Sequence, residues 1–446
     1  MYYLIVEIRS FKDLVGFFKS NIPFMVLATV LVLAVYGNGM NGELITADDI
    51  PSLVMNPNIR DLKGEASTLL FMSTLNSVLF HLFEFSPLAF HLSSLLIHIV
   101  NVFLVFLLLN MLFDKKIALA VSLLFSVHPG ISEAVLWISA KVYLVNAFLT
   151  LLILISFVNY RKTLNKKSLY FSGVVYGLAL IFIRSPWMLV APVMVFVVDF
   201  FLLGTKFNPK KFTAYAFYII NTFLYVVIWL RQSFFLRVVN LDVTYHAGPE
   251  RATPLLNRIP YTTAMVMKIL AFPMSLSLYH EGEVITKFHW ILMVAFTIAL
   301  VVAVLILLKK KKFVVAGLLM LIYIGTLPSY APIIIAWMLA ERYLYLSSVF
   351  FLVLVSLILL YMEKKNKIPD LFKITVIILL CIYSIRTFVR TFDWKTNKEI
   401  WLATEKQAPY SHRVYNNLGD VYSKEGNYAK AIESFAKSVQ IRPDYA

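Results

Sequence analysis

Two adjacent carboxylates, Asp48 and Asp49, follow the first long apolar stretch of the chain, which covers residues 23–36 and stops at Gly37. The pair therefore lies in a loop that leaves a membrane surface. A carboxylate in such a loop can act as a general base on an incoming hydroxyl group, because burial or a charged neighbour can raise its pKa. Adjacent side chains of an extended loop point to opposite sides, so only one of the two can face a substrate. We expect Asp49 to be the base, with Asp48 as the alternative; a solvated acidic turn is the non-catalytic interpretation.

A second polar group, Glu133, Trp137 and Lys141, follows His128-Pro129 near the outer end of a later apolar stretch. The spacing i, i+4, i+8 predicts that these three side chains share one face of a helix. Glu133 could position an acceptor or share acid–base work, and Lys141 could bind a phosphate. The alternative is an ion pair in which Glu133 and Lys141 neutralise each other.

Arg342 is the strongest phosphate candidate, because a guanidinium group presents a planar fork to phosphate oxygens and stays charged at any working pH. The alternative is an arginine at the membrane interface that pairs with the adjacent Glu341. Arg258 is expected on the same side of the membrane and is a further candidate for the phosphate.

His91, Ser94, His98 and Asn101 recur at helical spacing and predict a polar stripe inside the helix bundle. We interpret the histidines, together with His128, as supporting residues that make hydrogen bonds. A metal site is not expected, because the chain has no HExxH motif and His91 and His98 are seven residues apart.

The composition indicates a polytopic helical membrane protein. Of the 446 residues, 60% are hydrophobic and 15% charged, and many apolar runs are long enough to span a bilayer. The net charge of +16 resides in short loops between these runs, as the positive-inside rule requires, so it does not predict binding of nucleic acid. The single cysteine, Cys381, excludes an intrachain disulfide.

The basic loops predict eleven spans, an uncleaved N-terminus in the cytoplasm and a C-terminus outside. The stretch 259–278 is apolar, yet counting it as a span would place Lys309 to Lys312 outside, so we interpret it as re-entrant or interfacial. The expected spans are 23–36, 88–113, 117–128, 134–160, 168–183, 186–203, 212–230, 289–308, 313–327, 346–362 and 371–386.

The last part of the chain is of a different kind. Residues 412–445 match the tetratricopeptide (TPR) pattern in register, with Gly419, Tyr422, Ala431 and Phe435 at the positions where two helices approach. Residues 394–409 are expected to supply a preceding helix. We therefore predict an all-α protein with two domains, a membrane bundle at 1–390 and an extracytoplasmic TPR-type domain at 391–446.

Five separated motifs give the chain a family resemblance. They are Asp48-Asp49-Ile50 with Asn56-Pro57-Asn58, Phe90-His91-Leu92 with His98, His128-Pro129 with Glu133 and Lys141, Pro273-Met274-Ser275-Leu276, and Ala340-Glu341-Arg342-Tyr343. Together with the repeat, these motifs make the sequence resemble the transmembrane and TPR-containing O-mannosyltransferases, which belong to the GT-C class of glycosyltransferases. Where that family commonly has an acidic residue two places after the basic one, this chain has Tyr143.

The resemblance implies a GT-C helical bundle that transfers a sugar, mannose in this family, from a polyprenyl phosphate to a protein hydroxyl with inversion. It implies Asp48 or Asp49 as the base, Arg342 at the departing phosphate, and no metal. The expected partners are the lipid-linked sugar, a protein acceptor and membrane lipid. Two other classes stay open: a lipid-sugar flippase, which would be expected to show inverted repeats, and a membrane-anchored TPR scaffold, which would leave the acidic loop without a purpose.

Overall fold

The computed structural model describes residues 6–45, 47–60, 71–183, 185–206, 209–230, 255–281, 285–330 and 339–443. Over these ranges the protein is helical, and the one β-type contact is an isolated bridge between His280 and Leu339. The predicted all-α class is therefore confirmed for the part of the chain that is described. Most of the predicted outer segment after residue 230 lies outside these ranges up to residue 254.

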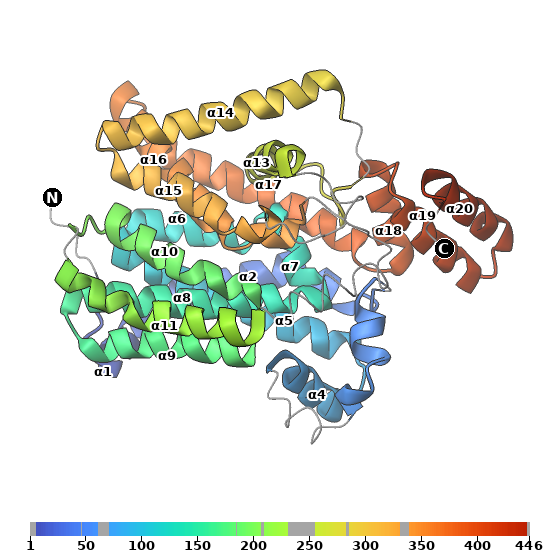
Figure 1. Cartoon of the computed structure of the whole chain (residues 1–446), viewed down its shortest axis with the longest axis horizontal. Coiled ribbons are helices and arrows are strands. Elements are labelled where there is room, and N and C mark those ends of the chain that lie inside the picture. Colours follow the sequence, from blue (N-terminus) through green and yellow to red (C-terminus); the bar gives the residue numbers. More distant parts are fainter. Residues whose placement is uncertain are drawn as a thin grey trace.

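Long, nearly parallel helices form the membrane part (Figure 1). Six segments are long and apolar enough to cross a membrane: Ile22–Asn41, Pro87–Leu112, Ile138–Thr163, Lys287–Lys309, Ser347–Asn366 and Leu371–Asp393. They contain helices α2 (Ile22–Tyr36), α5 (Pro87–Leu112), α8 (Lys141–Thr163), α14 (Lys287–Lys309), α16 (Ser347–Asn366) and α17 (Leu371–Asp393). No side chain of α14 is buried within the protein, as expected of an apolar helix whose partner is lipid.

Shorter helices complete the bundle. They are α1 (Phe11–Ser20), α4 (Phe71–Phe83), α6 (Lys115–Ser126), α7 (Ser132–Leu136), α9 (Lys166–Phe182), α10 (Ala191–Val197), α11 (Ala216–Tyr225), α13 (Leu255–Ala271) and α15 (Phe313–Ile324). Several of them lie within predicted spans but are too short by themselves to count as membrane-crossing. Among the residues that the structure describes, six spans are supported, or seven if the bent pair Lys115–Ser126 and Pro129–Leu136 is one span. The total of eleven stays a prediction.

The predicted fourth span, starting near residue 134, is wrong in its first turns. Helix α7 ends at Leu136, and Trp137 has extended backbone with φ −83° and ψ 121°. A short 3-10 turn, Ile138–Ala140, then leads into α8 at Lys141. The extended residue rotates everything after it about the chain axis. Glu133, Trp137 and Lys141 therefore do not share one helical face, contrary to the prediction from their spacing.

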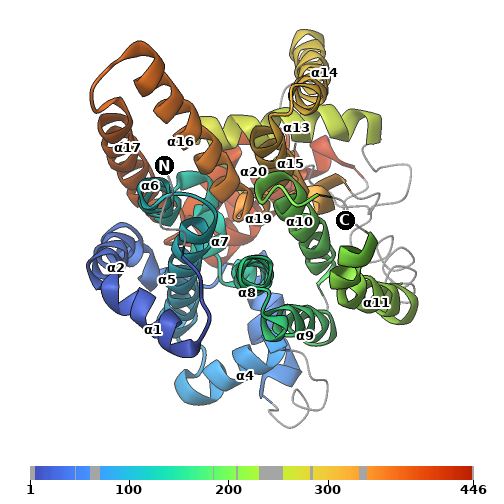
Figure 2. The same ribbon diagram turned by 90° about the vertical axis from the view of Figure 1, so that its left-hand side faces the viewer.

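Helix α13 crosses the direction of the long helices. It is seen end-on in Figure 1, where α14 lies in the plane, and it runs across the view in Figure 2. Its orientation agrees with the interpretation of 259–278 as a segment that does not span. The helix ends at Ala271, before Pro273, and the chain then continues toward the outer site.

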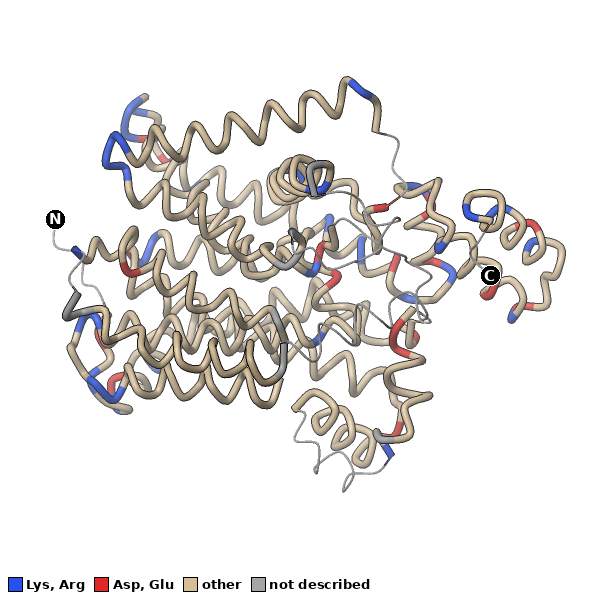
Figure 3. Tube along the Cα trace, viewed as in Figure 1, with Lys and Arg blue, Asp and Glu red and all other residues tan. Residues whose placement is uncertain are grey.

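Basic residues mark one end of the bundle. The loops remote from the C-terminal helices carry clusters of Lys and Arg (Figure 3), among them the turns between α14 and α15 and between α16 and α17. All of the long helices turn there, so the charge clusters lie on one membrane surface. This is the arrangement on which the predicted topology depends.

The C-terminal end holds three helices, α18 (Asn397–Gln407), α19 (His412–Lys424) and α20 (Tyr428–Ile441), at the opposite end of the bundle (Figure 1). α19 and α20 form the predicted TPR pair. A Cβ atom on Gly419 would come within 2.6 Å of the Phe435 ring, so this crossing needs glycine. Helix α18 is the preceding helix expected from residues 394–409.

Candidate functional site

The acidic pair is held at the outer end of the bundle by contacts with the start of the α8 segment. Asp49 is buried, and its Oδ2 accepts a hydrogen bond from the Ile45 amide at 2.9 Å. Its Oδ1 accepts one from the Ser139 amide at 2.8 Å and another from the Ser139 hydroxyl. Burial raises the pKa of Asp49 to about 6, although these hydrogen bonds favour the ionised form. Asp49 therefore fastens the loop to residue 139.

Asp48 points the other way and is exposed. It lines a cavity of about 600 Å³ whose walls come from the acidic loop, α4, the start of the α8 segment and the end of α9. The surrounding protein partly desolvates the Asp48 carboxylate and so raises its pKa. The positive charges of Arg342 and Arg413 oppose this effect. Of the two carboxylates, Asp48 is thus the exposed one that lines the cavity.

Glu133 and Arg342 form a buried ion pair between α7 and the turn that precedes α16. The Arg342 amide donates to Glu133 Oε2 at 3.0 Å, and the Arg342 guanidinium donates to Oε1. The rings of Trp137, Tyr143 and Tyr343 surround this guanidinium, with centroids 4.9, 5.7 and 5.1 Å from Cζ. Tyr143 thus contacts Arg342 at the position where the resembling family has an acid. Neither sequence-based alternative, Glu133 with Lys141 or Arg342 with Glu341, describes this pair.

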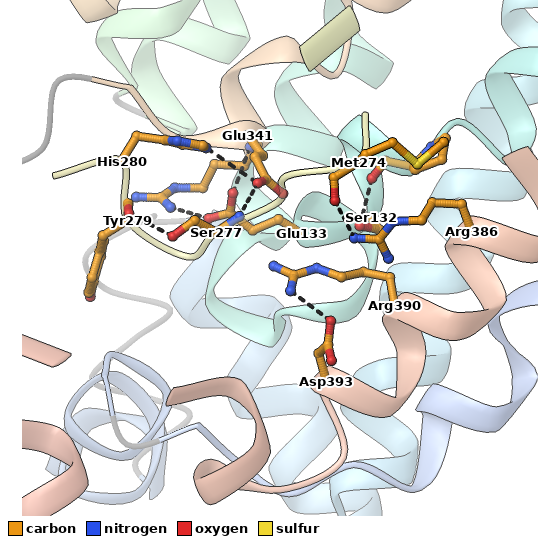
Figure 4. Close-up of polar contacts among 12 residues, drawn as sticks. Ser132, Glu133, Met274, Ser277, Tyr279, His280, Glu341, Arg386, Arg390 and Asp393 are labelled. Carbon is orange, nitrogen blue, oxygen red and sulfur yellow. Dashed lines mark hydrogen bonds and ion pairs between the residues drawn. The ribbon is translucent and has the colours of Figure 1, made fainter. Parts of the chain in front are cut away.

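Glu341 does not pair with Arg342; its side chain points toward Ser277 and His280 in the loop after α13 (Figure 4). Its Oε1 accepts a hydrogen bond from the Ser277 amide and lies 3.3 Å from His280 Nε2. The element Ala340-Glu341-Arg342 therefore ties two segments to the site. Glu341 positions the loop after α13, and Arg342 faces α7.

The other two cationic candidates lie on different sides of Arg342. Arg258 is buried on α13 and interacts electrostatically with Tyr343, whose ring also contacts Arg342. Lys141 is buried at the start of α8 with Nζ 5.1 Å from the Phe90 ring centroid, and the acidic group that acts on it is Asp49. Arg342 and Arg258 thus share one neighbourhood, and Lys141 belongs to the Asp49 side.

The histidines support the bundle. His98 Nε2 must donate to the Ser126 carbonyl at 3.0 Å, which leaves Nδ1 to accept from the Tyr345 hydroxyl at 2.6 Å. Likewise His128 Nε2 donates to the Leu270 carbonyl at 3.1 Å and joins α13 to the turn before α7. His91 is buried on the same stripe as His98. Among the described residues, no group of three or more His, Cys, Asp or Glu side chains could hold a metal ion.

Several residues of the site carried no recognisable signal in the sequence. Ser139 holds Asp49, and Arg413 of α19 acts on Asp48. Arg390 of α17 is buried and donates to Asp393 at 2.8 Å, and its neighbour Arg386 donates to the Met274 carbonyl at 3.0 Å (Figure 4). The spacing of Arg386 and Arg390 at the end of an apolar helix could have indicated a polar face. The others depend on long-range packing.

Comparison with known proteins places this site in context. A family model for the tetratricopeptide repeat matches residues 412–445. Protein O-mannosyl-transferase F38B6.6 of Caenorhabditis elegans is 25% identical over 406 residues, covering 82% of this chain and 52% of that protein. Protein O-mannosyl-transferase TMTC3 of Homo sapiens is 26% identical over 110 residues, covering 25% of this chain and 12% of the human protein.

The resemblance predicted from the sequence motifs is confirmed: the chain is similar to protein O-mannosyl-transferases and carries a TPR repeat. The matches span about half or less of the length of these relatives. The apolar helices and these relatives together identify a membrane protein.

Proposed function

We propose that this chain, similar to protein O-mannosyl-transferases, is a membrane glycosyltransferase of the GT-C class that moves a sugar from a polyprenyl phosphate to a protein hydroxyl. Mannose is the sugar that the similarity to protein O-mannosyl-transferases favours. The observation that carries the proposal is the position of Asp48, a carboxylate of raised pKa that lines a cavity and feels the charge of Arg342. The proposed site is therefore the cavity that Asp48 lines, together with the positive charge of Arg342 in the turn Glu341–Leu344.

In the proposed reaction Asp48 accepts the proton of the acceptor hydroxyl as its oxygen bonds to the anomeric carbon. The bond from that carbon to the phosphate oxygen breaks on the opposite face, so the configuration inverts. The leaving phosphate keeps its electron pair as an anion and needs no proton. Arg342, whose guanidinium lies over the Tyr343 ring, and Arg258, which interacts electrostatically with Tyr343, would stabilise the negative charge. Asp49 would hold the loop while Lys141 offsets its charge.

The donor's isoprenoid chain would lie in an apolar groove of about 470 Å³ between α13, α14 and α15. Ile259 of α13, next to Arg258, lines the groove together with Leu305 of α14 and Leu327 beyond α15. This arrangement suits a lipid whose tail stays in hydrocarbon while its phosphate meets a cation. A tail of this kind gains about 0.8 kcal/mol per buried CH₂ group.

For the topology we propose eleven spans, with the N-terminus in the cytoplasm and α18 to α20 outside. The domain division would then be a GT-C-type bundle at 1–390 and an extracytoplasmic TPR-type domain at 391–446 that binds the acceptor or a partner. The basic loops at one end of the bundle support this orientation.

Cysteine labelling tests the orientation. In a Cys381→Ala background, a cysteine replacing the exposed Tyr428 of α20 should react with an impermeant thiol reagent added to intact cells. A cysteine replacing the exposed Lys365 should react only after the cells are opened. The reverse pattern would invert the topology.

A reconstituted transfer assay tests the function. Full-length protein in liposomes, supplied with polyprenyl-phosphate mannose and a serine- and threonine-rich peptide, should produce mannosylated peptide and free polyprenyl phosphate in equal amounts. Movement of the lipid-linked sugar across the bilayer without peptide modification would identify a flippase. Peptide binding with neither activity would identify a TPR scaffold.

A further inference from the structure

The C-terminal helices are attached to the outer site at several points. The Glu43 amide donates to the Lys395 carbonyl at 2.9 Å, and Asn397 Nδ2 donates to the Leu44 carbonyl at 3.0 Å. Trp401 of α18 is buried next to Tyr279, with ring centroids 5.9 Å apart. These contacts join α18 both to the segment before the acidic pair and to the loop after α13.

Helix α19 adds a buried ionic contact to this attachment. Glu281, in the loop after α13, is buried and accepts a hydrogen bond from the Ser411 hydroxyl at 2.5 Å. Arg413, in the first turn of α19, places Nε 3.7 Å from the same Glu281 oxygen and is 7% exposed. The guanidinium of Arg413 is thus held inside the junction between the TPR pair and the membrane bundle, where its charge is weakly screened.

Tyr279 shows where this junction lies relative to the acidic pair. The charges that act on its buried hydroxyl are those of Asp48, Arg342, Arg413 and Glu281. Asp48 in turn is acted on by Arg342 and Arg413, and it repels the ionised form of its neighbour Asp49. The charges that act on the carboxylate lining the cavity therefore include one arginine from the membrane bundle and a second from the TPR pair.

We infer that Arg413, held by Glu281 in this junction, is a positioning residue of the transferase site, and that it supplies the positive charge by which the docked TPR pair acts on Asp48, the proposed base. This inference rests on the proposed function. It assigns the first TPR helix a direct part in the site, in addition to any contact with the acceptor. A TPR pair that is displaced would leave Asp48 with Arg342 alone.

The pH dependence of transfer tests this role. Arg413→Gln in the full-length protein should move the acid limb of kcat/KM upward by about half a pH unit or more, because losing a nearby positive charge raises the pKa of Asp48. Arg413→Lys should keep the limb near that of the wild type. Lys398→Gln removes a positive charge from α18 in an exposed pair with Glu425, and should leave the limb unchanged.

Glu281→Gln separates electrostatics from simple loss of the contact. It breaks the same junction but leaves the Arg413 charge uncompensated, so the limb should stay in place or move to lower pH. An upward shift in both Arg413→Gln and Glu281→Gln would assign Arg413 a structural role and overturn the inference, as would an unshifted limb in Arg413→Gln. If Arg413→Gln does not fold, a shift of the acid limb to higher pH in Glu281→Gln alone overturns the inference. Absence of sugar transfer by the wild-type protein would instead overturn the proposed function.

Discussion

Asp48→Asn should reduce sugar transfer by about 10²-fold or more while the protein folds and binds the lipid donor normally. The amide preserves the size of the side chain but cannot take a proton at working pH. Asp48 is exposed, and among the described residues its carboxylate makes no hydrogen bond that holds the loop. Little stability therefore depends on it. The measurement is initial rate of peptide mannosylation at matched protein levels, with donor binding determined separately.

Asp49→Asn is the matched comparison. Its carboxylate accepts bonds from Ile45 and Ser139, and an amide group would turn an N–H toward one of these donors. We expect a lower melting temperature together with a loss of roughly tenfold in rate, since a broken buried hydrogen bond costs about 1–3 kcal/mol. Near-native transfer in Asp48→Asn with a large loss confined to kcat in Asp49→Asn would return the role of base to Asp49.

The pH profile follows from the same assignment. Asp48 must be ionised to accept a proton, and partial desolvation raises its pKa above the usual value for aspartate. Transfer should therefore fall as the pH drops through this raised pKa, and the wild-type acid limb should disappear in the residual activity of Asp48→Asn.

Glu133→Gln should be the most destabilising single change in the site. It leaves the Arg342 guanidinium buried among three aromatic rings without its carboxylate, and breaking such a pair costs about 3–5 kcal/mol. Thermal unfolding in detergent would show this loss. Lys398→Gln, which breaks an exposed pair in α18, is the control and should leave the melting temperature unchanged.

Arg342→Lys separates charge from geometry at the same place. Lysine keeps the positive charge but not the fork that meets Glu133 and would meet a phosphate, so most turnover should be lost. The double variant Glu133→Met with Arg342→Met removes both charges and should recover much of the stability without activity. Wild-type turnover in Arg342→Lys would exclude Arg342 from the phosphate site.

Some residues of the candidate site could be singled out before the fold was known. Asp48 and Asp49 stand out because they follow an apolar run, and Arg342 because it follows Glu341 in a motif outside the spans. The membrane class, the basic end of the bundle and the TPR pair could also be predicted. Hydrophobic runs, loop charges and repeat spacing are local properties of the chain. Lipid and water act on such patterns directly, so these features can be recognised without the tertiary structure.

The sequence by itself thus predicted which side chains could carry the chemistry, and the loop charges predicted the end of the bundle at which they gather. Only the tertiary structure decided their partners. One extended residue, Trp137, separates Glu133 from Lys141 and turns Glu133 toward Arg342, 209 residues away along the chain. Which aspartate lines the cavity was decided in the same way, by the bond from the Ser139 amide to Asp49, and packing likewise placed Arg413 beside Glu281. Buried charges must be satisfied wherever packing places them, and packing depends on contacts between distant segments that no local pattern encodes.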